Sequence, residues 1–212
     1  MRSISRAILL ACLLIVPLCA GAQALLDELV AAVANDRADE VRSLLARGLD
    51  PNSVDSHGNP LLLIASGNGS AATVDALLAA KAKVDVANAY NDTPMLVASI
   101  KGYTDVVRRL RAAGASLDPP GWTPLIYAAT GGHEALVRYL LDQGANINAA
   151  SPNGTTALMM AVREHRVDVA RLLLSRGADV TRRNDAGLTA LAYAEQGNEK
   201  ELAAQLRARG AR

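Results

Sequence analysis

Large aromatic side chains and reactive sulfur are scarce in this chain of 212 residues. It has no phenylalanine and a single tryptophan, Trp122. Both cysteines, Cys12 and Cys19, lie near the N-terminus, so the chain beyond them has no thiol nucleophile, disulfide framework or thiolate metal site. Nor is charge of one sign concentrated, because the 22 basic and 21 acidic residues are mixed throughout. This mixture argues against nucleic acid as the partner, since phosphate binding needs a concentrated basic face.

The first residues, MRSISRAILLACLLIVPLCAGAQA, have the three parts of a secretory signal peptide. Arg2 and Arg6 precede an apolar run over residues 7–18, and small residues follow it. The run is well short of the roughly 20 residues that span a bilayer, so a retained anchor is the weaker interpretation. We therefore expect a leader over residues 1–22, cleaved after Ala22 or after Ala24, and a folded domain over residues 23–212.

The rest of the chain repeats itself, and a fixed period of this kind determines the fold class. A helical segment that ends in a short apolar phrase recurs as LLARG, LLAAK, LRAAG, LLDQG, LLSRG and LRARG. Successive phrases are 33, 33, 30, 33 and 33 residues apart. They end at Gly48, Lys81, Gly114, Gly144, Gly177 and Gly210.

A second phrase marks a helix start in step with the first, as in DTPMLVA from Asp92 and WTPLIYAA from Trp122. A polar residue can accept a hydrogen bond from the free amides of the first turn, and proline fits the next position. The expected capping residues are Asn59, Thr93, Thr123, Thr156 and Thr189, followed in three units by Pro60, Pro94 and Pro124. Each unit is thus predicted to be a helix, a tight turn and a second helix, followed by an extended loop.

These residues resemble the ankyrin-repeat family, whose consensus runs close to G-x-T-P-L-H-x-A-A-x-x-G-H-x-E-V-V-x-L-L-L. The best match is GWTPLIYAATGGHEALVRYLLDQGANIN, residues 121–148. The resemblance extends from about Leu25 to the C-terminus and implies an all-α solenoid of six helix-turn-helix units with projecting β-turn loops, the first and last units serving as caps. It implies a fold and a way of binding, not a reaction.

The sequence departs from the family pattern in two respects. In five of the six units, the slot of the T-P-L-H histidine is expected to hold an apolar residue, so that packing takes the place of a side-chain hydrogen bond. These residues are Leu62, Leu96, Ile126, Met159 and Ala192. The second unit is the least regular, because SGNGSAATVD is interpreted as containing one extra residue and Lys81 stands where glycine is usual. We expect this unit to be the loosest.

The junction between the third and fourth units is short. It runs from Gly114 to Gly121 in seven steps, whereas Gly144 to Gly154 takes ten. A projecting loop is therefore clipped beside Trp122, which leaves two interpretations. Trp122 is either uncovered on the surface as a binding anchor or folded over its own prolines as a local plug.

The resemblance places a candidate protein-binding site on the concave face, formed by loop tips and the exposed side of the first helices. Neighbouring units are expected to bring Tyr90, Ile100 and Trp122 together, edged by charged residues. The full set of predicted partner-binding residues is Tyr90, Asp92, Ile100, Lys101, Trp122, Thr130, Asn153, Arg163 and Glu164.

The sequence does not contain the complete motifs of common enzyme classes. HEAL at His133 begins like the zinc motif H-E-x-x-H, but Val137 stands where the second histidine is needed. No G-x-S-x-G elbow and no G-x-x-x-x-G-K loop occur, and the three histidines fall in three different predicted turns. We predict no catalytic, cofactor-binding or metal-binding residue, and a binding role rather than an enzyme.

The sequence thus predicts a monomeric, exported and periplasmic protein that acts by binding another protein. The resemblance to exported bacterial ankyrin proteins implies two roles, which the residues do not separate. One is an accessory factor for a periplasmic enzyme, such as a catalase in peroxide defence. The other is an immunity protein that neutralises a toxic effector. A hydrolase or metal enzyme on a repeat scaffold is the alternative from another class.

Overall fold

A computed structural model describes residues 23–212, so the expected leader over residues 1–22 lies outside the described residues. The helices come in pairs. The first helix spans residues 23–34 and is followed by α2 (Ala38–Ala46). The later pairs are α3 (Leu61–Asn68) with α4 (Ala71–Ala79), α5 (Pro94–Lys101) with α6 (Thr104–Ala112), α7 (Pro124–Gly131) with α8 (Glu134–Asp142), α9 (Ala157–Arg163) with α10 (Val167–Ser175), and α11 (Ala190–Gln196) with α12 (Lys200–Ala208).

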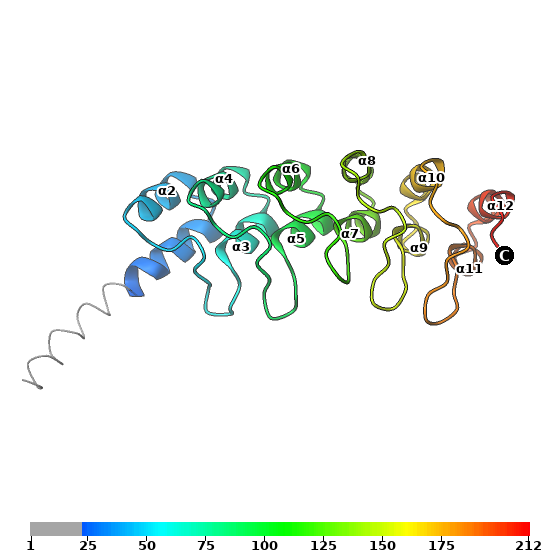
Figure 1. Ribbon diagram of the computed structural model, residues 1–212, viewed down its shortest axis with the longest axis horizontal. Helices are drawn as coiled ribbons and strands as arrows, with labels where there is room; N and C mark the ends of the chain where they lie inside the picture. The colour runs from blue at the N-terminus through cyan, green and yellow to red at the C-terminus, as the bar shows by residue number, and fades with distance from the viewer. Residues whose placement is uncertain (1–22) are drawn as a thin grey trace, which may run out of the picture.

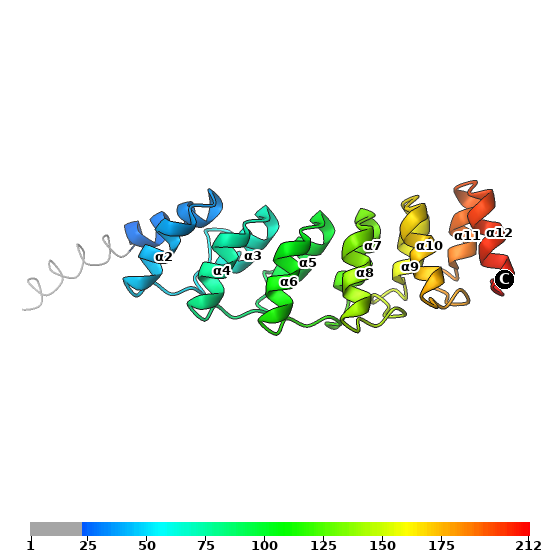
Figure 2. The ribbon, with the colours of Figure 1, turned by 90° about the horizontal axis from the view of Figure 1, so that it is seen from above.

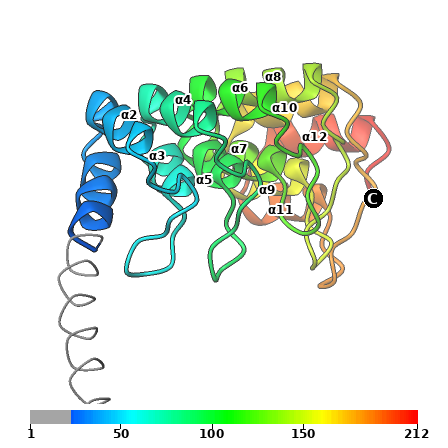
Figure 3. The ribbon, with the colours of Figure 1, turned by 60° about the vertical axis from the view of Figure 1, so that its left-hand side comes forward.

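The six pairs stack side by side in an elongated row (Figure 1, Figure 2). The second helix of each pair forms one layer and the first helix forms the other. The loops between pairs project from one side of the row, and Figure 3 shows them hanging together on that side. Over residues 23–212 no strand forms, and β pairing is limited to isolated bridges such as Val54 with Pro60. The predicted all-α solenoid of six units is confirmed.

The core is linear, because each pair packs chiefly against its neighbours along the row. Apolar residues at helical spacing explain it: on α8, Leu136, Val137 and Leu140 all face inward and are fully buried. On α7 the buried face is Leu125, Ile126, Ala128 and Ala129. Stability in such an array is approximately a sum of unit terms and nearest-neighbour interfaces.

Threonine caps begin four of the first helices, as the sequence predicts. The side-chain oxygen of Thr93 accepts a hydrogen bond from the main-chain N–H of Leu96, and Thr123 does the same for Ile126. Thr156 and Thr189 repeat the arrangement at α9 and α11. Pro94 and Pro124 occupy the first helical position, where a missing N–H costs no intrahelical bond.

The predicted start of the second unit is wrong by one residue. Pro60, not Asn59, is the N-cap of α3, and no side chain caps this helix. Asn59 instead donates its side-chain N–H to the carboxylate of Asp55 at 3.1 Å, and its side-chain oxygen accepts from Asn88 of the next loop at 3.2 Å. Asn59-Pro60 resembles the Thr-Pro pair that begins other first helices, but it lies one position earlier in the repeat.

The extra residue expected in the second unit is therefore absent. Gly69 ends α3 in the left-handed conformation, 33 residues before Gly102, which ends α5 in the same way. With this register, the slot of the family histidine holds Leu63 rather than Leu62. Leu63 is 8% exposed, so packing still replaces the polar tie in this unit.

His133 provides a polar tie between units. Its Nε2–H donates to the main-chain carbonyl of Ile100 in the preceding unit at 2.9 Å. The imidazole lies against Gly102, whose φ of +75° and lack of Cβ both suit this approach. In the next unit Arg166 takes the same role and donates from Nε to the carbonyl of Thr130 at 3.0 Å. His133 is thus accounted for as a structural side chain.

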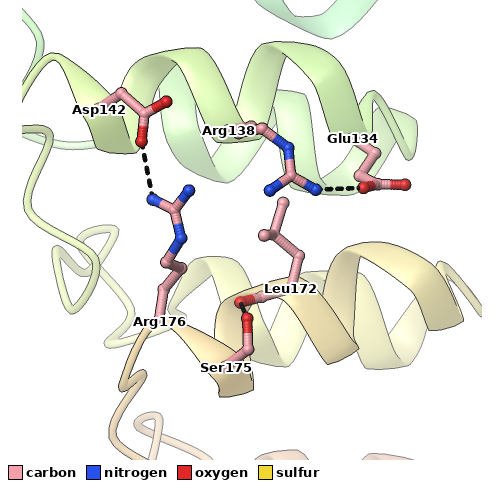
Figure 4. A network of polar contacts seen from close by, with 6 residues as sticks. All are labelled: Glu134, Arg138, Asp142, Leu172, Ser175 and Arg176. Atoms are coloured by element: carbon pink, nitrogen blue, oxygen red, sulfur yellow. Dashed lines mark hydrogen bonds and ion pairs between the residues drawn. The ribbon is translucent and has the colours of Figure 1, made fainter.

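Several exposed ion pairs lie on the layer of second helices, away from the loops. Figure 4 shows Arg138 paired with Glu134 one turn earlier on α8 at 2.7 Å, and Arg176 at the end of α10 paired with Asp142 of the preceding unit at 2.8 Å. These side chains are between about a third and a half exposed. Exposed pairs of this kind contribute about 0–1 kcal/mol each, so the apolar core supplies most of the stability.

Lys81 is held in the left-handed region that glycine occupies at the ends of other second helices. Its φ is +69°, against +99° for Gly114 in the same slot of the next unit. We expect Lys81→Gly to raise the free energy of unfolding by about 1 kcal/mol, because the Cβ strain is removed. Urea denaturation followed by circular dichroism measures the change. The matched control is Ala79→Gly in the last turn of α4, which should lower stability by about 0.5–1 kcal/mol. A loss of stability for both variants would contradict the prediction.

Candidate functional site

The loop before α7 is the shortest on the loop side, as Figure 1 shows and the sequence spacing predicts. The carboxylate of Asp118 accepts the main-chain N–H of Asn146 in the next unit at 3.0 Å. Asn148 holds the same place one unit later and accepts the N–H of Asp179 at 2.9 Å. The residues missing after Asp118 are therefore the counterparts of residues 149–151.

That deletion removes the residue which normally folds the loop tip. In the preceding loop, Asn88 Oδ1 accepts the main-chain N–H groups of both Tyr90 and Asp92 at 3.0 Å. No counterpart of Asn88 exists in the short loop. Pro119 and Pro120 stand there, fixing the backbone through their rings and offering no N–H that needs a partner.

The short loop leaves a pocket of about 390 Å³ between three successive loops. We call it the Trp122 pocket. The loop before α5, the short loop, the start of α7 and the loop before α9 supply its main walls: Tyr90, Asp92, Pro120, Trp122, Tyr127 and Pro152. Side chains from three units thus meet on the side of the row from which the loops project.

Trp122 is neither the fully exposed binding anchor nor the buried local plug that the sequence leaves open. Its side chain is partly exposed, and it also packs against the core. Its ring is 5.7 Å from the ring of Tyr127, with the planes tilted by 39°, a favourable geometry for an aromatic pair. Trp122 therefore forms a fixed wall of the pocket rather than a free anchor or a buried plug.

Tyr90 is far more exposed. Its side chain is 84% accessible, the highest value among the exposed large hydrophobic residues of the described range. An aromatic ring held out at a loop tip gains nothing from the core, but it has apolar area that a partner can bury.

Asp92 gives the Trp122 pocket its negative charge. Its carboxylate is 3.4 Å from the side-chain amide of Asn88. The pKa of Tyr127 is raised, first by burial of the phenol and then by the charge of Asp92. The two side chains therefore interact electrostatically across the pocket, and the phenol of Tyr127 remains a neutral donor at physiological pH.

The structure does not bring Ile100 to Tyr90 and Trp122. Ile100 lies six residues beyond Pro94 on α5, roughly 9 Å along the helix axis at 1.5 Å per residue, and it is absent from the pocket wall. The expected cluster of these three side chains is corrected to Tyr90, Trp122 and Tyr127. Lys101 shares the position of Ile100 at the far end of α5.

The remaining predicted residues lie apart from the pocket or serve the scaffold. Thr130 donates its hydroxyl to the carbonyl of Ile126 at 2.8 Å. Arg163 and Glu164 pair with each other at 2.9 Å at the end of α9. Asn153 is turned into its own loop, where its side-chain oxygen accepts from the hydroxyl of Ser151 at 2.6 Å.

Sequence reasoning missed Tyr127 and Pro152. Tyr127 follows a buried T-P-L-I run and reads as another core residue, yet it is only partly buried. A usable signal was present, since the chain has just five tyrosines and one of them lies five residues after the only tryptophan. Pro152 belongs to the loop before α9 in the next unit, and it lines the pocket together with residues of the short loop.

Comparison with known protein families decides what kind of scaffold carries this pocket. A family model described as ankyrin repeats (3 copies) matches residues 29–120 and 112–184, more than half of the chain. The chain belongs to the ankyrin-repeat family. A crystal structure of an ankyrin repeat domain from Acinetobacter baumannii is similar, with a TM-score of 0.79 and 29% sequence identity over 87% of this chain and 98% of that one. No curated protein is similar enough to extend the comparison.

Ankyrin repeats are typically protein–protein interaction modules. On the loop side of this chain, the Trp122 pocket is the hollow in which aromatic side chains from two units meet. Within residues 23–212, no cluster of three or more histidine, cysteine or acidic residues is arranged to hold a metal ion. Over the same range, no helix is both long enough and apolar enough to cross a bilayer.

Proposed function

We propose that this ankyrin-repeat protein is exported to the periplasm and binds a partner protein through its loop side, with the Trp122 pocket at the centre of the contact. The observation that carries the proposal is the pocket itself. It combines an exposed aromatic ring, Tyr90, with a fixed one, Trp122, at the point where the repeat period shortens. Aromatic residues in a desolvated centre supply most of the binding free energy of typical interfaces.

The predicted leader supports the exported location. In the source cell, the mature protein should begin at Gln23, or at Leu25 if the later small-residue site is used. Periplasmic extraction followed by N-terminal sequencing measures this directly. An intact Met1 on protein recovered from the cytoplasm would contradict export.

Two roles fit a periplasmic binding protein of this kind, an accessory factor for an enzyme such as a catalase and an immunity protein that blocks a toxic effector. Partner identity distinguishes them. Crosslinking in intact cells, purification of the protein and mass spectrometry of the adduct would yield an enzyme in the first case and a secreted toxin in the second. The adduct should disappear with Trp122→Ala and persist with Arg138→Ala, because Arg138 lies on the layer of second helices (Figure 4).

A further inference from the structure

The chemical make-up of the Trp122 pocket restricts what it can bind. Its walls present three aromatic rings, those of Tyr90, Trp122 and Tyr127. Proline rings and aliphatic groups supply most of the rest, and Asp92 is the one charged residue among the residues that line it. The pocket therefore combines π faces with a single carboxylate.

Each class of ligand group meets this arrangement differently. An anion would be repelled by the Asp92 carboxylate, and an apolar group would desolvate that carboxylate without compensating it. A cation gains twice, because the aromatic faces attract positive charge and the carboxylate can pair with it through charge-assisted hydrogen bonds.

The protein does not supply this cation itself. In the described part of the chain Asp92 forms no ion pair, whereas other acidic side chains are neutralised across unit boundaries. Asp75 pairs with Arg109 at 2.9 Å, and Asp142 pairs with Arg176 at 2.8 Å. The charge of Asp92 thus stays available on the surface that a partner would cover.

We propose that the Trp122 pocket takes one cationic side chain of the partner, an arginine or a lysine. The proposal rests on the proposed protein-binding function and specifies its central contact. The cation lies against Trp122 and Tyr127 and pairs with Asp92. Tyr90, which has most of its surface still to bury, packs along the aliphatic stem. A volume of about 390 Å³ accommodates one such side chain.

Trp122 is the only tryptophan in the chain, so its fluorescence reports on this pocket alone. The probes are three blocked tripeptides, glycine-arginine-glycine, glycine-lysine-glycine and glycine-citrulline-glycine. Citrulline has the shape of arginine without its charge. We expect saturable changes in emission with the arginine and lysine peptides at a Kd of about 1–10 mM, and binding of the citrulline peptide at least about threefold weaker.

Asp92→Asn should reduce the difference between the arginine and citrulline peptides, leaving only the part that the aromatic rings supply, while the circular dichroism spectrum stays unchanged. The control is Asp185→Asn, an exposed loop carboxylate that lies outside the pocket, and it should leave the arginine titration as in the parent protein. Equal binding of arginine and citrulline, a difference in Asp92→Asn as large as in the parent protein, or no emission change with any peptide would each overturn the proposal.

Measuring partner binding by the two variants tests the cationic contact separately from the proposed protein-binding site. If Trp122→Ala abolishes binding of the identified partner and Asp92→Asn leaves it unchanged, the binding site is correct and the cation is wrong. If both variants bind the partner as the parent does, the proposed site itself fails. A loss in both variants, together with the peptide result, supports the cationic contact.

Discussion

Leu140→Ala lowers the free energy of unfolding by about 3 kcal/mol. Leu140 is fully buried on α8, in the fourth of the six units, and its truncation leaves a cavity at the middle of a linear core. Each unit packs only against its neighbours, so distant units make no contacts that could compensate for the stability lost at this site. Urea denaturation monitored by far-ultraviolet circular dichroism gives the value.

Leu141→Ala is the matched control for Leu140→Ala. The two leucines are adjacent on α8, but Leu141 is only partly buried, so its truncation removes less apolar area from the core. The expected loss is about half as large or smaller. Equal losses for the two variants would mean that the helix face assigned to the core is wrong.

Trp122→Ala weakens binding of the partner protein by about 2 kcal/mol or more, roughly 30-fold in Kd, because it removes the fixed aromatic wall of the pocket. The ring also packs on the core and on Tyr127, so a loss of stability is expected as well. That loss should be smaller than the loss for Leu140→Ala, since Trp122 is only partly buried. Isothermal titration calorimetry and urea denaturation measure the two effects separately.

Arg138→Ala provides the comparison for Trp122→Ala. Arg138 makes an exposed ion pair with Glu134 on a second helix, and the pair contributes about 0.3–0.5 kcal/mol to a helix. Partner affinity should stay unchanged. If Trp122→Ala unfolded the fourth unit while binding through the remaining units stayed intact, Trp122 would be a structural plug and the pocket would lose its proposed role.

Local chemistry made most of the fold predictable. The threonine caps depend on residues three positions apart, as in Thr123 and the N–H of Ile126, and such contacts are visible as sequence phrases. The second unit shows where this reasoning stops. Asn59-Pro60 has the letters of a cap followed by an N1 proline, but Asn59 is held by Asp55 and Asn88 instead, and α3 begins one residue later than expected.

The pocket was only partly predictable, because it is built from three loops that are far apart in sequence. Tyr90 and Trp122 were found through their repeat positions, and both line the pocket. Ile100 lies about two turns along α5 from the loop end of that helix, so a shared concave face does not bring it to Tyr90 and Trp122. The shortening of the loop before α7 is visible in the sequence, but the presence of Pro152 from the next unit in the same pocket depends on how the loops pack in three dimensions.

Site-specific photocrosslinking in the source cell measures which face of the protein meets a partner. A photoreactive residue is placed at Tyr90 on the loop side or at Arg138 on the layer of second helices, both of which are exposed. We predict a discrete protein adduct from position 90 that disappears when Trp122→Ala is added to the same chain, and no adduct from position 138. An adduct from position 138 alone, or one from position 90 that survives Trp122→Ala, would contradict a binding site centred on the Trp122 pocket.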